Sequence, residues 1–352
     1  MKIKIALVDD DRSYLERIVN VFNSRYMENL LIYSYTDLQL AYEQLEIKKI
    51  DVLIVSERFE IEVEKVPQNC GIAYFVDSHD INIWKEQAAI CKFQKIDLIY
   101  KEILNVYSEK AANFSAIRAN SDDCRIYAFT SPCGGVGTST VAAAFSVACA
   151  KRGRKVLYLN MEVFGSADVF FRAEGQLDMS DIIYALKSKK SNVALKIESA
   201  LKQDATSGVN YFSASKIALD MMELNEEEKM TLLGILQSSG KFDLIVVDIA
   251  MGLDRSTIEL LKKMDKIILV SDGTAASNTK VYRLNAAMNV LRESGDHMPP
   301  MYIVYNQYSN YIGRVLESVE FEMLGGAPRY EHATEQQVIE QLSQMAFMEQ
   351  MM

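Results

Sequence analysis

One ten-residue stretch, SPCGGVGTST at positions 131–140, constrains the fold of this chain more than any other feature. It follows the apolar run RIYAFT and precedes a long stretch rich in Ala and Val. Three glycines in four positions free the backbone to curl, so that successive N–H groups can converge on a phosphate at the start of a helix. The stretch therefore predicts a strand, an anion-binding loop and a helix in succession. A tight glycine turn without a ligand is the alternative.

Four more apolar runs follow the loop, and each of them ends in a polar residue. They are KVLYLN, DLIVVD, KIILVS and MYIVYN, which end at Asn160, Asp248, Ser271 and Asn306. Runs that are apolar on both faces suit parallel strands covered by helices on either side, and ligands of such sheets bind at the carboxyl ends of the strands. We therefore expect a functional site at these four strand ends.

The first hundred residues alternate short strand-like runs with amphipathic stretches, which is typical of a doubly wound α/β sheet. The predicted strands are 3–8, 30–35, 51–56, 72–76 and 96–101, and the predicted helices are 14–22 and 38–45. The length of 352 residues suggests two domains. Because residues 108–123 are small and polar, we predict a linker there, between a domain of residues 1–107 and a domain of residues 124–352. The predicted fold class is thus α/β, with two doubly wound domains.

The second domain resembles the deviant Walker ATPases of the ParA/MinD superfamily over about residues 125–330. Their loop reads KGGVGKTT where this chain reads CGGVGTST, so Cys133 stands at the signature lysine and Thr138 at the phosphate-binding lysine. The resemblance implies a P-loop NTPase fold with ATP and Mg²⁺ as its ligands. Because both lysine positions are substituted, it implies an ATPase that is slow at most.

The resemblance also assigns roles to single residues of this chain. Ser139 and Asp248, which ends the Walker B strand LIVVD, match the groups that hold Mg²⁺ directly or through water, and Glu162 matches the acid that positions the attacking water. Gly252 matches the glycine that senses the γ-phosphate, and Asn306 the asparagine that reads adenine. The nucleotide-binding residues implied are Gly134, Gly135, Val136, Gly137, Thr138, Ser139, Thr140, Asp248, Gly252 and Asn306. The alternatives are a helix cap for Asp248, a turn for Asn306 and a solvated surface acid for Glu162.

The first domain resembles response-regulator receiver domains of the flavodoxin-like type. Asp9 and Asp10 follow the first predicted strand, where receivers hold an acidic pair for Mg²⁺, and Lys101 ends the expected fifth strand, where they keep a lysine. The phosphoacceptor should end the third strand, but that strand ends in Ser56. A serine hydroxyl lacks the carboxylate that forms an acyl phosphate, so the resemblance implies a non-phosphorylatable receiver that serves as an interaction module. A generic flavodoxin-like domain is the alternative.

The order of the two domains and the weakened P-loop together resemble the TadZ/CpaE family of pilus assembly proteins. The resemblance implies a cytoplasmic localisation or assembly factor, at a cell pole, for a Tad/Flp-type pilus secretion system. It would bind ATP, hydrolyse it weakly or not at all, and use a nucleotide-bound homodimer as a scaffold for proteins of that machinery. The alternative is an active, cycling MinD-like ATPase that controls the placement of the division site or of flagella.

Charge and hydropathy argue against nucleic acid and membrane as partners. The chain has 38 Lys and Arg against 48 Asp and Glu, a net charge of −10, and lacks the basic clusters that nucleic-acid binding needs. No window approaches 18 apolar residues, and the tail VIEQLSQMAFMEQMM has no Lys or Arg, so we expect its apolar positions to pack in the core or on a partner rather than in a membrane. The five cysteines show no CxxC spacing, which predicts a reduced protein without a disulfide framework.

Overall fold

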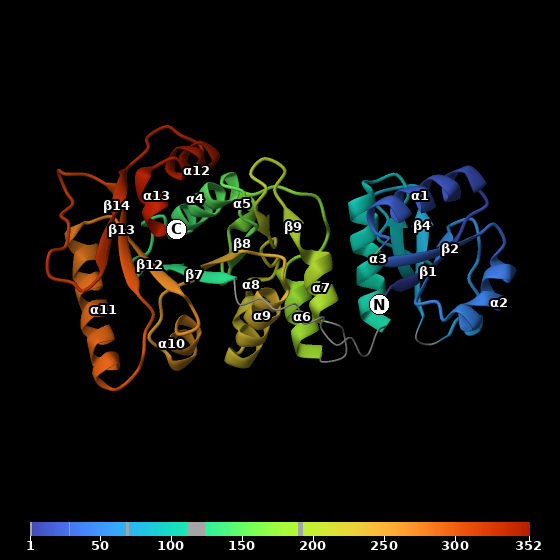
Figure 1. The fold of residues 1–352 in the computed structure, drawn as a ribbon, viewed down its shortest axis with the longest axis horizontal. Helices are drawn as coiled ribbons and strands as arrows, with labels where there is room; N and C mark the ends of the chain where they lie inside the picture. Colours follow the sequence, from blue (N-terminus) through green and yellow to red (C-terminus); the bar gives the residue numbers. More distant parts are fainter. Residues whose placement is uncertain (1, 28, 68–69, 111–123, 189–192) are drawn as a thin grey trace. The chain divides into compact units, whose positions relative to one another are not determined.

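A computed structural model describes residues 2–27, 29–67, 70–110, 124–188 and 193–352, which form two compact units with one sheet each (Figure 1). Unit 1 takes in the described residues of Met1–Ala116 and Tyr184–Ala200, and unit 2 those of Ile117–Ile183 and Leu201–Met352. Most of the predicted linker, residues 111–123, lies outside the described residues. The domain boundaries proposed from the sequence therefore stay a prediction.

Unit 1 is built on a sheet with the strand order β2-β1-β3-β4-β6-β5. Its strands are β1 (Ile3–Val8), β2 (Leu30–Tyr35), β3 (Val52–Ser56), β4 (Gly71–Val76), β5 (Ile83–Trp84) and β6 (Gln87–Cys91). All neighbours run parallel except the short edge strand β5, which is antiparallel to β6. The order 2-1-3-4, continued by the next parallel strand, is that of flavodoxin-like sheets, so the predicted fold class is confirmed for this unit.

Alternate side chains of β1 show which helices cover which face of this sheet. Leu7 and the other odd-numbered residues pack with α1 (Arg12–Arg25) and α3 (Ile96–Lys110), whereas Val8 packs with α2 (Leu38–Lys48) on the opposite face. The remaining elements of unit 1 are the 3-10 turn η1 (Val63–Lys65), α7 (Val193–Ala200) and the part of α6 (Met179–Ser188) from Tyr184 on. Leu195 of α7 joins the cluster that contains α1 and α3.

The strand predicted at 96–101 is wrong, because these residues begin the helix α3. In this helix Ile99, Tyr100, Ile103 and Leu104 are buried, which is the spacing of one helical face and not the alternation of a strand. The fifth parallel strand is instead β6, whose sequence QAAIC precedes Lys92. Lys92, and not Lys101, therefore follows the fifth parallel strand.

Unit 2 contains an eight-stranded sheet with the order β14-β13-β12-β7-β11-β8-β10-β9. Its strands are β7 (Arg125–Thr130), β8 (Val156–Asn160), β9 (Lys202–Gln203), β10 (Asn210–Tyr211), β11 (Leu244–Asp248), β12 (Lys266–Ser271), β13 (Met301–Tyr308) and β14 (Glu322–Pro328). Neighbouring strands pair in parallel except β9 with β10. Because β7, β8, β11, β12 and β13 are parallel, their carboxyl ends meet at one edge, as the sequence predicts.

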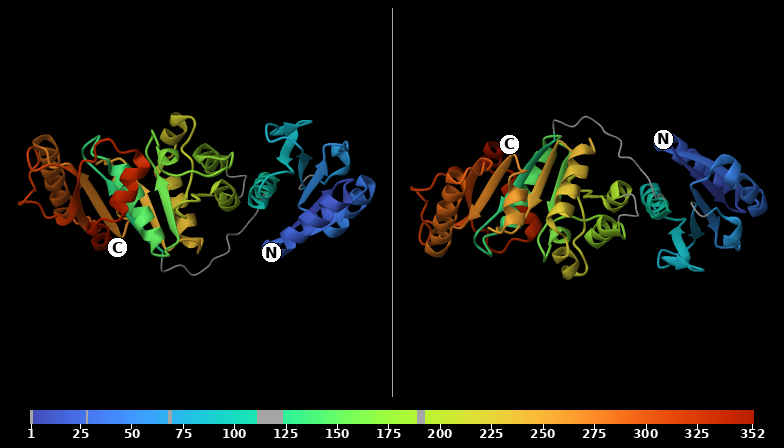
Figure 2. Two further views of the ribbon diagram at one scale, coloured as in Figure 1. Left: turned by 90° about the horizontal axis from the view of Figure 1, so that it is seen from above. Right: turned by 90° about the horizontal axis from the view of Figure 1, so that it is seen from below.

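Helices lie on both faces of this second sheet (Figures 1 and 2). The longer ones are α4 (Thr138–Lys151), α9 (Glu226–Ser238), α10 (Arg255–Leu261), α11 (Ala275–Glu293), α12 (Glu335–Ser343) and α13 (Ala346–Met351). The shorter or peripheral ones are α5 (Ala167–Phe170), α6 (Met179–Ser188) and α8 (Ala218–Met222). Helix α4 lies between the sheet and α12, so every residue from Val141 to Cys149 is buried. A helix enclosed in this way can be apolar all round, which explains its Ala- and Val-rich sequence.

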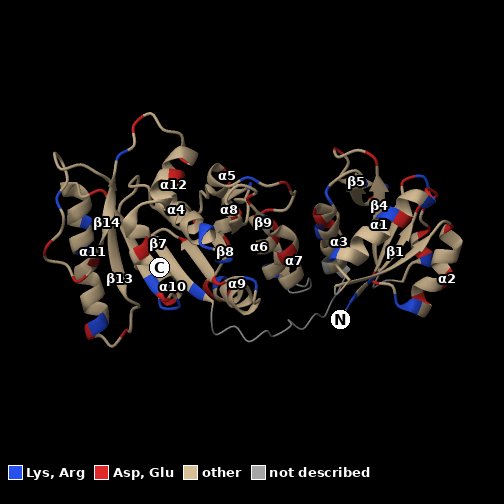
Figure 3. Cartoon of the chain, turned by 45° about the horizontal axis from the view of Figure 1, so that its top comes forward, with Lys and Arg blue, Asp and Glu red and all other residues tan. Residues whose placement is uncertain are grey.

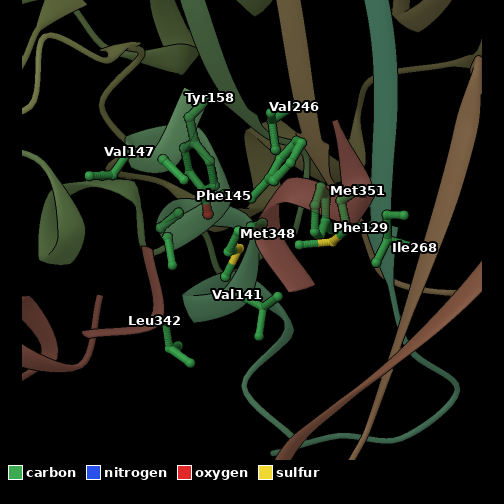
Figure 4. Packing of buried hydrophobic residues seen from close by; sticks show 14 of the residues in the cluster. Phe129, Val141, Phe145, Val147, Tyr158, Val246, Ile268, Leu342, Met348 and Met351 are labelled. Atoms are coloured by element: carbon green, nitrogen blue, oxygen red, sulfur yellow. The ribbon is translucent and has the colours of Figure 1, made fainter. Parts of the chain in front are cut away.

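The tail of the chain belongs to the core of unit 2. Leu342 and Met348 are fully buried in the cluster that surrounds α4, and Figure 4 shows Met348 and Met351 among Phe129 and Phe145. The prediction of core or partner packing is thereby confirmed as core packing for Ile339, Leu342, Phe347, Met348 and Met351, whereas Ala346 is exposed. No helix in the described ranges is long and apolar enough to cross a membrane.

Replacing Leu342 with Ala should destabilise unit 2 by about 2 to 5 kcal/mol, because a fully buried leucine leaves a cavity between α12 and α4. Gln341 is exposed on the same helix, and its change to Ala should alter the free energy of unfolding by less than about 0.5 kcal/mol. Denaturant unfolding followed by circular dichroism measures both variants. Equal midpoints for Leu342→Ala and Gln341→Ala would contradict the core role of the tail.

Candidate functional site

The glycine-rich loop joins β7 to α4 and is held in a conformation that only glycine adopts easily. Gly135 and Gly137 have φ angles of +78° and +79°, in the left-handed region. A Cβ atom on Gly137 would also lie 2.5 Å from Nδ2 of Asn306. The same Asn306 amide donates a 2.8 Å hydrogen bond to the carbonyl oxygen of Val136, and so fastens the loop to β13. The loop leads directly into the N-terminus of α4, whose free N–H groups and helix dipole favour an anion.

Three oxygen-bearing side chains predicted from the sequence come together beside this loop. Ser139, in the first turn of α4, donates a 3.4 Å hydrogen bond from Oγ to Oε2 of Glu162. Asp248 ends β11, next to β8, and is fully buried. Its Oδ2 accepts hydrogen bonds from the Tyr158 hydroxyl at 2.7 Å and from Nδ2 of Asn160 at 2.9 Å. Asp248 is therefore part of a buried polar network and does not cap a helix.

The other carboxylate oxygen of Asp248, Oδ1, is buried and makes no hydrogen bond within the described residues. Burial raises the pKa of Asp248 from 3.8 to about 7, and the negative charge of Glu162 acts in the same direction. A buried acceptor without a donor is costly unless a cation or a proton occupies it. Mg²⁺ prefers hard oxygen ligands, so the hydroxyl of Ser139 and the carboxylates of Asp248 and Glu162 fit that ion.

Gly252 follows β11 and packs tightly against the start of α10. A Cβ atom there would lie 2.6 Å from Oδ2 of Asp254 and 3.0 Å from Oγ1 of Thr257. Asp254 is the N-cap of α10, and its Oδ1 accepts a hydrogen bond from the Thr257 N–H. This packing alone explains a glycine at position 252, and its role toward a γ-phosphate stays a prediction.

A pocket of about 220 Å³ lies beside Thr140 and Asn306. Its other lining residues are Gln307, Pro328, Arg329, Tyr330, Ala333, Glu335 and Val338. The pocket combines an amide, an aromatic ring, aliphatic groups and a guanidinium, which together suit a flat heterocycle with polar edges. The sequence did not single out Arg329 or Tyr330, because they belong to the segment after β14 and reach the site only through the tertiary fold.

Comparison with known families divides the chain in the same order. Residues 1–108 match the family model of the TadZ-like receiver domain, and residues 124–298 match the model of an AAA domain. The chain carries a TadZ-like receiver domain and an AAA domain. A search of curated proteins gave no match.

Solved structures resemble the part of the chain that contains the AAA domain. A ParA family ATPase from Chlorobium tepidum TLS is 18% identical, with a TM-score of 0.53 over 65% of this chain and 96% of that one. The septum site-determining protein MinD from Pyrococcus horikoshii OT3, solved with Mg-ADP, is also 18% identical, with a TM-score of 0.49 over 62% of this chain and 94% of that one. The likeness to the ParA family ATPase shows the fold, and the predicted ParA/MinD-type P-loop NTPase fold of the AAA domain is confirmed.

The loop of the AAA domain contains no lysine or arginine between positions 131 and 140. Cys133, at the first substituted lysine position, is buried, and its Sγ lies 3.7 Å from the carbonyl oxygen of Ser277 in α11. Thr138, at the second, is the first residue of α4 and carries a neutral hydroxyl. The side chains of the loop therefore offer no positive charge to an anion, and its backbone N–H groups are the donors that the loop itself provides.

The TadZ-like receiver domain places a buried ion pair at the carboxyl end of its sheet. Lys92 Nζ lies 2.6 Å from Oδ2 of Asp9, and both side chains are buried. Lys92 also donates a 3.2 Å hydrogen bond to Oγ of Ser56, which ends β3. The lysine expected at position 101 is thus supplied by Lys92, while Ser56 lies where the sequence placed it.

Proposed function

We propose that this chain is an ATP- and Mg²⁺-binding localisation or assembly factor for a Tad/Flp-type pilus secretion system, acting in the cytoplasm at a cell pole. A nucleotide-bound homodimer would serve as the scaffold, with weak hydrolysis or none. One observation carries the proposal: the AAA domain places the side-chain oxygens of Ser139, Glu162 and Asp248 beside a curled loop, yet that loop has no cationic side chain. Its position after a TadZ-like receiver domain supports the pilus role.

The residues described above divide the work of binding. The adenine base would occupy the pocket beside Asn306, and the phosphates would accept hydrogen bonds from the N–H groups of residues 134–140. Ser139 and Oδ1 of Asp248 would hold Mg²⁺, which neutralises negative charge on the phosphates when bound.

Hydrolysis needs a positioned water and stabilisation of developing charge, and the chain is equipped for the first only. The Glu162 N–H donates a 3.0 Å hydrogen bond to Oδ1 of Asn160, which fixes the backbone that carries this carboxylate. Neither Cys133 nor Thr138 can stabilise added negative charge as a lysine does. A slow reaction is the expected result, and a fast one would favour the cycling MinD-like alternative.

Protein partners suit this surface better than nucleic acid does. In both units, Lys and Arg positions are interspersed with Asp and Glu positions (Figure 3). An interspersed pattern with a net charge of −10 offers little counterion release, which drives nucleic-acid binding. We therefore propose proteins of the pilus machinery as partners, together with a second copy of this chain.

Nucleotide-stripped protein should bind Mg-ATP with micromolar affinity in calorimetry. At the phosphate-binding lysine position, Thr138 can donate one neutral hydrogen bond where a lysine would donate a charged one. This change lowers the binding free energy by about 1 to 2 kcal/mol and thus the affinity roughly tenfold. Ser139→Ala should weaken binding further in the presence of Mg²⁺, whereas Gln341→Ala on α12 should not. Light scattering should show a dimer with ATP. No heat with millimolar Mg-ATP, or a monomer at saturating ATP, would contradict the proposal.

A further inference from the structure

Basic side chains already neutralise the acidic pair of the receiver domain. Asp9 is fully buried, and its Oδ2 forms the 2.6 Å ion pair with Lys92. The Lys92 ammonium also lies 5.4 Å from the centre of the Tyr14 ring and 4.0 Å from Oδ1 of Asp77. Lys92 is thus enclosed by an aromatic ring, Ser56 and carboxylates. It fills the buried side of the site at the carboxyl ends of β1 and β3.

Asp10 is the more exposed residue of the acidic pair, and it forms an ion pair with a second cation, Arg58. Nη1 of Arg58 lies 3.2 Å from Oδ1 and 3.0 Å from Oδ2 of Asp10. One guanidinium nitrogen thus engages both oxygens of this carboxylate. Arg58 comes two residues after Ser56, and the turn that follows β3 brings it back over β1.

The charges of these residues balance without any bound ion. Two carboxylates, Asp9 and Asp10, face two cations, Lys92 and Arg58. A divalent cation needs several oxygen ligands at this strand end, and it would meet a guanidinium already bonded to both oxygens of Asp10. Entry of the ion would require Arg58 to give up both of its hydrogen bonds to Asp10.

We propose that the Arg58 guanidinium occupies the position at which the receiver resemblance places a divalent cation. With Lys92 it keeps the strand ends in one arrangement, so that the receiver domain neither requires nor admits a metal ion. The domain then presents a constant surface to its partners, independent of metal and of phosphodonors.

Mn²⁺ binding to the nucleotide-free full chain tests this proposal, with free Mn²⁺ measured by electron paramagnetic resonance. Asp10→Asn identifies the fraction bound in the receiver domain, because the AAA domain can also bind the ion. The unmodified protein and Arg58→Lys, which keeps the charge, should show no Mn²⁺ binding that depends on Asp10 up to about 1 mM. Arg58→Gln should bind Mn²⁺ at least about tenfold more tightly, because a competing positive charge is gone, and adding Asp10→Asn should abolish the gain.

Two results would overturn the proposal. One is Mn²⁺ binding by the unmodified protein that Asp10→Asn removes; the other is an Arg58→Gln variant that gains no binding dependent on Asp10. Misfolding can be detected separately, because Trp84 is the single tryptophan of the chain and lies in unit 1. Its fluorescence should report an unchanged unfolding temperature for Arg58→Gln, since the Arg58 side chain is 62% exposed.

Discussion

Restoring both loop lysines, by Cys133→Lys together with Thr138→Lys, should raise the single-turnover rate of ATP hydrolysis by on the order of 10³-fold to 10⁵-fold. A cation that reaches the transferring phosphoryl group contributes rate factors of about this size, as an arginine finger does. The factor corresponds to about 4 to 7 kcal/mol of transition-state stabilisation. The loop at 131–140 has no cationic side chain to supply it, so Mg²⁺ and backbone dipoles would carry most of the stabilisation there.

The two positions differ in how readily they accept a lysine. Thr138 begins α4 and is half-buried, so a longer side chain can extend from it toward the loop. Cys133 is buried with Sγ near the Ser277 carbonyl, so a lysine introduced in its place would have to turn its ammonium out of the protein. Each single variant should therefore gain less than the double variant, and Cys133→Ala is the matched control for lost packing. A rate of about one turnover per minute in the unmodified protein would contradict the scaffold role.

Replacing Asp248 with Asn should remove a destabilising contribution of up to about 4 kcal/mol that the nucleotide-free protein carries at pH 8 but not at pH 4, and should remove Mg²⁺-dependent ATP binding. The pKa of Asp248 is raised by burial from 3.8 to about 7, and each unit of such a shift corresponds to about 1.36 kcal/mol. Asn is neutral, and its carbonyl oxygen can still accept hydrogen bonds from Tyr158 and Asn160. It cannot supply the charge that a divalent cation requires.

The pH dependence follows from the same raised pKa. Between about pH 4 and pH 7 the unfolded chain has already lost the Asp248 proton while the folded chain retains it, so stability falls as pH rises through this range. This contribution should be absent from Asp248→Asn, and the difference between the two proteins should be largest above pH 7. Denaturant unfolding at pH 5 and pH 8 measures it, with the exposed Glu293→Gln as control. A parallel pH dependence in both proteins would contradict the assignment.

The fold could be predicted from the sequence wherever a run of residues had one periodicity. The five buried strands around the loop are apolar on both faces and bounded by polar residues, so their type and direction follow from local sequence. The run IDLIYK is short and apolar. Only together with Ile103 and Leu104, which follow it in the chain, do its apolar residues show the spacing of a helix. Short apolar runs carry no decisive period, and tertiary packing decides between strand and helix.

The candidate site shows the same limit. The resemblance to the ParA/MinD motifs singled out Ser139, Glu162 and Asp248, and the fold brings these three side chains close together. Tyr158 was not singled out, although it lies two residues before Asn160 on β8 and so shares its face of the sheet. Nothing local marks a tyrosine within an apolar strand as the hydrogen-bond donor to a carboxylate on the neighbouring strand.

The hydrogen bond between the Asn306 amide and the Val136 carbonyl lowers the side-chain entropy that would be lost when a ligand binds. The bond uses one of the two N–H groups of the amide and fixes its rotamer before any ligand arrives. Under the proposed function, the second N–H group and the amide oxygen would contact the edge of the base. Ordering a free side chain on binding costs about 0.5 to 1.5 kcal/mol, and this chain has already met that cost in folding. A nucleotide bound as proposed would thus meet a preorganised site at its base, the part that distinguishes one nucleotide from another, beside a loop without lysines.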